Sequence, residues 1–129
     1  MRYLSEEELA LASRFLFLSM AILVIQKDTE ALHKSTFKIK EPFADLLGKM
    51  EHEAVSERRQ LRGRMAKKQL QVVSLNKNDS FSSFLFICKG REEKRNYFNP
   101  AIRKKVENIL RELIQKAQQP HQHYSSTNT

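Results

Sequence analysis

The residues best placed to do chemistry in this sequence are basic ones gathered between positions 58 and 68. The segment holds six of the chain's 23 lysines and arginines: Arg58, Arg59, Arg62, Arg64, Lys67 and Lys68. Spread around a helix, several of these cations can reach a phosphate backbone together, and each neutralised phosphate releases counterions. The segment therefore predicts binding to a polyanion, with nucleic acid as the leading candidate.

Two further basic clusters follow along the chain. The second cluster consists of Lys89, Arg91, Lys94 and Arg95, and the third cluster consists of Arg103, Lys104 and Lys105. If the segment before them folds back as a hairpin on the preceding helix, all three clusters can form one positive field. The opposing interpretation is that these side chains only solvate exposed faces, as most lysines and arginines do.

The charge is divided unevenly between the two halves of the chain. Residues 1–57 carry seven Lys or Arg against ten Asp or Glu, whereas residues 58–129 carry sixteen against five, and the chain as a whole has a net charge of +8. Such asymmetry suggests a polyanionic partner for the basic half. A helix with an acidic start and a basic end complements its own dipole, which explains part of the pattern. The excess that continues from Lys89 to Lys116 has no such explanation.

Other kinds of functional site have little support in the sequence. His121 and His123 lie in a polar end segment, and His33 and His52 have no partner at ligand spacing, so we expect no metal and no cofactor. We find no glycine-rich phosphate loop, nucleophile elbow or zinc signature, and therefore expect no enzyme. Cys88 is the only cysteine. It lies in an apolar run, which predicts a buried side chain in a protein of a reducing compartment.

The first half of the chain predicts two long helices. Ser5 and Glu8 match a capping box, and the helix that follows is apolar on nearly every face to about Lys34. Pro42 suits the first turn of a second helix. This helix extends over residues 42–68 unless a glycine in it breaks it.

The second half predicts a β-hairpin and a third helix. Residues 69–75 and 81–88 are rich in aromatic and β-branched side chains, and the turn-forming residues 76–80 separate them. The second of these strands is apolar on both faces near Phe84 to Ile87 and should lie central to the structure. Residues 90–96 form either a charged loop or a continuation of the strand. Asn99 and Pro100 then predict the cap and first turn of the last helix.

The predicted order is helix, helix, β-hairpin, helix, which is an α+β fold that is mostly helical. We expect one domain over residues 1–119 and a disordered polar tail over residues 120–129. The order resembles the winged-helix fold, in which a basic recognition helix precedes a hairpin wing. The resemblance implies a turn within residues 42–68, near Ser56 or at Gly48, because that fold needs two separate helices there.

Residues 9–25 form a nearly continuous apolar stretch with one charge, Arg14. A spanning helix needs about 20 apolar residues, and the acidic flank Glu6–Glu8 does not suit a signal peptide. We therefore expect a buried core helix in a cytoplasmic protein without a membrane partner. So much apolar helix surface also predicts a homodimer. The rival to nucleic-acid binding is a protein–protein interaction module, an adaptor or inhibitor, whose acidic and basic halves pair with each other or with another protein.

Overall fold

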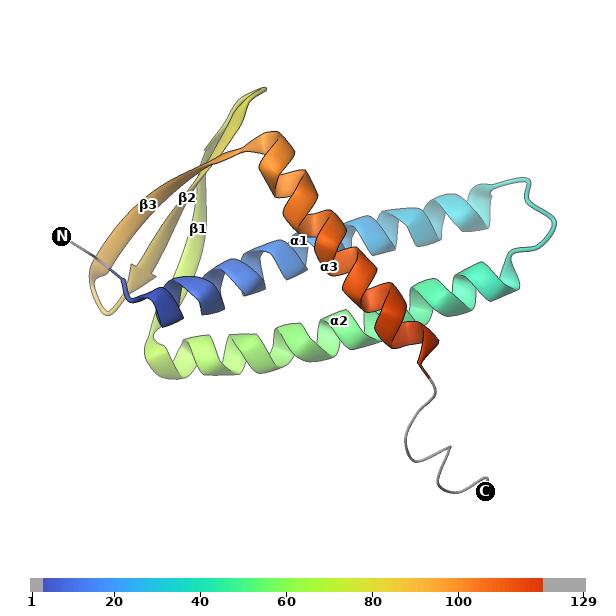
Figure 1. Cartoon of the computed structure of the whole chain (residues 1–129), viewed down its shortest axis with the longest axis horizontal. Coiled ribbons are helices and arrows are strands. Elements are labelled where there is room, and N and C mark those ends of the chain that lie inside the picture. Colours follow the sequence, from blue (N-terminus) through green and yellow to red (C-terminus); the bar gives the residue numbers. More distant parts are fainter. Residues whose placement is uncertain (1–3, 120–129) are drawn as a thin grey trace, which may run out of the picture.

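The first two helices form a long antiparallel hairpin. The computed structural model describes residues 4–119. Helix α1 spans Glu6–Lys34 and helix α2 spans Glu41–Lys68, and the two lie side by side (Figure 1). The predicted capping box is confirmed, because Ser5 Oγ accepts a hydrogen bond from the Glu8 N–H at 3.1 Å and the Ser5 N–H donates to Glu8 Oε1 at 2.8 Å.

Helix α2 is continuous over its whole length. Gly63 does not break it, because Leu61 and Met65 on either side of the glycine are both buried in the core. The helix ends only at Lys68, where Gln69 takes a left-handed conformation with φ 55°. The turn that a winged helix needs within residues 42–68 is therefore absent, and this part of the expected likeness is wrong.

The sheet has three antiparallel strands in the order β1-β2-β3. Strand β1 spans Leu70–Lys77, β2 spans Phe81–Cys88 and β3 spans Arg91–Phe98. The predicted hairpin and the central place of its second strand are confirmed. The charged segment after it continues as strand β3, joined by a two-residue turn in which Lys89 and Gly90 both have positive φ, 51° and 82°.

One face of the sheet is buried against the helices. On β2, the side chains of Ser82, Phe84, Phe86 and Cys88 are buried, and the residues between them are more exposed. This alternation is that of a strand with one face on the core. The buried position of Cys88 agrees with its expected role as a small core side chain.

Helix α3 spans Asn99–Gln118 and crosses over the α1–α2 hairpin (Figure 1). The predicted cap role of Asn99 is wrong, since Asn99 is already helical and Phe98 occupies the cap position. The Asn99 side chain instead accepts a hydrogen bond from Ser82 Oγ at 2.7 Å and donates to the Asn78 carbonyl at 2.9 Å. These bonds fix the start of α3 to the β1–β2 turn.

A single arginine connects all three helices. Arg14 of α1 forms hydrogen bonds of 2.8 and 3.0 Å to the Glu57 carboxylate of α2, and of 3.2 and 3.3 Å to Glu112 of α3. The half-buried guanidinium lowers the pKa of Glu57. Arg14, the only charged residue in the apolar part of α1, therefore has a carboxylate partner on each of the other two helices.

By length and composition, α1 is the one helix among residues 4–119 that could cross a membrane. Core helices of soluble proteins pass the same test. Here Leu18, Ala21, Ile22 and Ile25 of α1 are almost completely buried within the fold. This burial gives α1 the position of a core helix.

Candidate nucleic-acid interface

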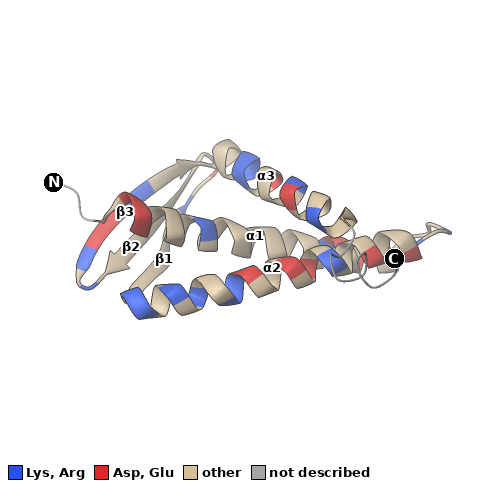
Figure 2. Cartoon of the chain, turned by 60° about the horizontal axis from the view of Figure 1, so that its bottom comes forward, with Lys and Arg blue, Asp and Glu red and all other residues tan. Residues whose placement is uncertain are grey.

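The structure brings the first two basic clusters together at one end of the molecule. Strand β1 leaves the end of α2 and pairs with the end of β2, where Leu70 lies opposite Cys88. The β2–β3 turn is therefore next to the last turn of α2, and the Lys89 N–H donates to the Gln69 carbonyl at 3.3 Å. Figure 2 shows the lysines and arginines of both segments at the same end of the folded molecule. We call this the basic end.

Most cations of the basic end have no carboxylate partner. Among residues 4–119, six of them form no ion pair: Arg58, Arg59, Arg62, Arg64, Lys67 and Lys89. Arg62 lies over the Phe15 ring with 5.5 Å between its guanidinium carbon and the ring centroid. The others are available to an anion without first breaking an ion pair within the described chain.

The remaining cations of the two clusters are partly neutralised by the protein itself. Two acidic residues at the start of α1 reach the basic end, with Glu7 3.5 Å from the Lys68 ammonium and Glu8 2.9 Å from the Arg91 guanidinium. Arg95 pairs with Glu93 at 2.7 Å. The sequence does not predict these pairings, because Glu7 and Glu8 are more than 60 positions away from Lys68 and Arg91 along the chain.

The third cluster is not part of the basic end. Strand β3 separates it from the β2–β3 turn, and eight strand residues extend about 26 Å. Within the cluster, Lys104 lies 3.6 Å from Glu107, and Lys105 lies over the Phe17 ring at 5.7 Å. The expectation of a single field from all three clusters is therefore wrong, because the strand keeps Arg103 and its neighbours at the opposite end of the sheet.

Lys94 points to a different face from its neighbours. Residues directly opposite each other on paired strands share a face of the sheet, and Lys94 lies opposite Leu85, whose side chain is on the face away from the helices. Arg91 and Arg95 lie opposite Cys88 and Phe84 on the covered face. Strand β3 thus places Arg91 and Arg95 on one face of the sheet and Lys94 on the other, so Lys94 is not part of the basic end.

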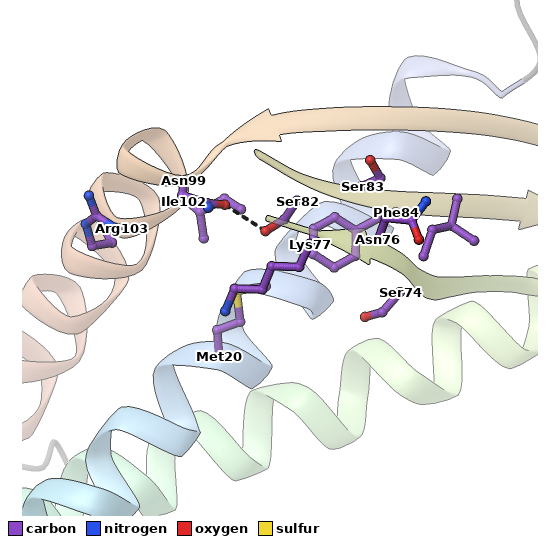
Figure 3. A pocket seen from close by; sticks show the side chains of 11 residues that line it. Met20, Ser74, Asn76, Lys77, Ser82, Ser83, Phe84, Asn99, Ile102 and Arg103 are labelled. Atoms are coloured by element: carbon purple, nitrogen blue, oxygen red, sulfur yellow. Dashed lines mark hydrogen bonds between the residues drawn. The ribbon is translucent and has the colours of Figure 1, made fainter. Parts of the chain in front are cut away.

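A cavity of about 390 Å³ lies at the far end of the sheet, where the middle of α1, the end of β1, the start of β2 and the start of α3 meet (Figure 3). Its lining includes Ser74, Asn76 and Arg103, and the Lys77 side chain extends towards Met20. The third cluster thus contributes Arg103 to this cavity. Its mixed polar and apolar lining contains no chemistry that identifies a ligand.

Among residues 4–119 there is no group of three or more His, Cys, Asp or Glu side chains that could hold a metal ion. His33 and His52 lie in α1 and α2 and are exposed. The histidines of the end segment, His121 and His123, lie outside the described residues, as does the predicted disordered tail.

Glu8 is the most strongly perturbed carboxyl group near the basic end. Its pKa falls from 4.5 to about 2 because Arg91 donates a hydrogen bond to it and the Ser5 N–H donates another. Cys88 Sγ lies 3.5 Å from the same carboxylate. Glu8 therefore stays ionised through ordinary pH and holds Arg91 away from an external anion.

Replacing Glu8 by glutamine should remove one acid-sensitive contribution to stability. A carboxylate with a lowered pKa in the folded state stabilises the fold above the unfolded value and loses that effect as the pH falls. The difference in unfolding free energy between wild type and Glu8→Gln should be largest at pH 7 and shrink between pH 4.5 and about 2. Urea unfolding across this range measures it. Glu6→Gln, in the exposed first turn, is the control, and an unchanged difference for Glu8→Gln at low pH would contradict the assignment.

The geometry defines a class of protein, a small α+β domain with three helices, a three-stranded antiparallel sheet and one basic end. The model of the YhjD protein family matches residues 3–118, so the chain belongs to the YhjD family. It is 32% identical over 107 residues to the "Uncharacterized protein YhjD" of Bacillus subtilis (strain 168), covering 83% of this chain and 89% of that protein. No solved structure shows a significant match to the chain.

Proposed function

We propose that this protein is a non-enzymatic, cytoplasmic nucleic-acid-binding protein with a regulatory role, which contacts phosphates through the basic end. The observation that carries the proposal is the juxtaposition of the last turns of α2 and the β2–β3 turn, with six cations that form no ion pair within residues 4–119. Arginine and lysine in such a cluster are the side chains that bind a phosphate backbone.

The length of the cationic part of α2 suits a nucleic-acid strand. Residues 58–68 rise about 16 Å along the helix axis at 1.5 Å each. One strand of a DNA duplex carries a phosphate about every 3.4 Å of axis. The segment can therefore lie beside about five phosphates, which matches the number of its unpaired cations.

Gly63 supports a close approach of the strand to this segment. A side chain added at Gly63 would meet no atom within 4 Å, so packing does not require a glycine there. Glycine in an exposed helix interior costs about 1 kcal/mol relative to alanine. The missing side chain leaves the backbone open between Arg59, Arg62 and Lys67, where a phosphate strand can come close to the helix.

Binding should depend steeply on salt. With about five phosphate contacts, the logarithm of the association constant should fall against the logarithm of salt concentration with a slope of about −4.5 for duplex DNA. Fluorescence anisotropy with labelled duplex DNA, single-stranded DNA and RNA measures the slope and the preferred form. If none of the three binds at low salt, the proposed function is wrong.

A further inference from the structure

The outer face of the sheet, on the side away from the helices, carries several large apolar side chains. The register places Val73, Leu85, Phe81, Phe98 and Ile87 on this face, together with the polar Gln71, Ser83 and Asn96. The Phe81 and Phe98 rings lie 5.6 Å apart between centroids and are about half exposed, 47% and 51%. An antiparallel sheet with one solvated face normally carries polar side chains there. We call this surface the outer sheet face.

We propose that the outer sheet face is the contact between two copies of this chain in a homodimer. Two sheets that pack face to face form a sandwich in which apolar side chains of both inner layers meet. A two-fold dimer uses the same patch on both copies, so the patch must be complementary to itself. The proposal does not depend on nucleic-acid binding.

The charge of the outer sheet face favours a second copy over another partner. The charged residues that the register places on this face are Glu92, opposite Ile87, and Lys94, opposite Leu85. Neither forms an ion pair within residues 4–119. The chain carries a net charge of +8, so two copies repel each other as whole molecules. A face with one charge of each sign and no net charge adds no local repulsion to a contact between two such chains.

The layout of the face resembles that of a protein–protein interface. The apolar Leu85 and Ile87 lie on the central strand beside Ser83, whereas both charged residues of the face, Glu92 and Lys94, lie on the edge strand β3, which also carries Phe98. An apolar centre with charged residues at the rim is the usual arrangement. Three strands of eight residues cover roughly 26 by 14 Å on each copy, about 730 Å² for the two copies together, which is less than the about 1,200 Å² of a standard specific interface and corresponds to a weak, transient one. The dimer should therefore dissociate on dilution.

Sedimentation of the full chain over a concentration series tests the dimer. Wild type should be dimeric at high concentration and monomeric when diluted. Leu85→Lys should raise the dissociation constant at least about tenfold, because two lysines would face each other in a desolvated contact. The control, Leu23→Lys, changes an exposed leucine of α1 and should leave self-association unchanged. A wild-type protein that stays monomeric up to about 1 mM, or a Leu85→Lys variant that dimerises normally, overturns the proposal.

A charge experiment keeps the test independent of folding. Glu92→Lys gives each face two positive charges and Lys94→Glu gives it two negative ones, and both residues are exposed at an edge strand. Each variant alone should self-associate at least about tenfold more weakly at low salt, and a mixture of the two should form heterodimers. Circular dichroism checks that both remain folded. If the two variants do not associate with each other, the outer sheet face is not the contact.

Discussion

A triple variant in which Arg59, Arg64 and Lys67 are replaced by glutamate (Arg59→Glu, Arg64→Glu and Lys67→Glu) should bind duplex DNA roughly a hundredfold or more weakly at low salt. All three side chains are exposed and form no ion pair or ring contact within the described chain, so their replacement leaves the fold intact. Each lost phosphate contact lowers the magnitude of the salt slope by about 0.9. The slope of the triple variant should therefore be smaller by about 2.7, measured by the same anisotropy titration.

The matched control changes the charge by the same amount elsewhere. Lys27, Lys38 and Lys49 are exposed residues of the acidic half of the chain. Reversing these three charges should leave most of the affinity and of the salt slope unchanged. Equal losses in the two triple variants would mean that net charge governs binding, and the basic end would not be a site.

Replacing Phe86 by alanine should destabilise the protein by about 3–5 kcal/mol. Phe86 is completely buried on the central strand, between Val72 of β1 and Glu93 of β3. The substitution leaves a cavity in the core, so the protein loses both the transfer free energy of the buried ring and the packing contacts that the ring makes. A domain of this size has about 5–15 kcal/mol in total, which makes the loss easy to measure by urea unfolding.

Phe81→Ala provides the comparison on the same strand. Its ring is on the outer sheet face, so in the dilute monomer the substitution should cost about 1 kcal/mol or less. The unfolding must be measured below the concentration at which the chains self-associate, since the proposed dimer would add stability to wild type. Equal losses for the two phenylalanines would contradict the assignment of the faces of β2.

Local patterns were enough to predict most of the fold. The capping box at Ser5 and Glu8, the turn before Phe81 and the proline in the first turn of α3 each depend on residues close in sequence. Strand β3 could not be predicted firmly, because Arg91, Glu92, Glu93, Lys94 and Arg95 have the composition of a loop. Partners distant in sequence stabilise the strand, including Glu8, which binds Arg91 across 83 positions.

The candidate site was predicted in composition but not in arrangement. The sequence identified the basic segments, and the structure joined two of them through the neighbouring ends of α2 and β2. The third cluster was separated because a strand, rather than a loop, intervenes between residues 89 and 103. The outer sheet face was not anticipated at all, since an apolar strand gives no sign of which face lacks a cover.

Arg14 has a consequence for how the protein unfolds. Its guanidinium binds Glu57 of α2 and Glu112 of α3 at the same time. If any one of the three helices separated from the others, at least one half-buried charge would lose its partner, which is costly. Partial opening of a single helix is therefore disfavoured, and the three helices should unfold as one cooperative unit.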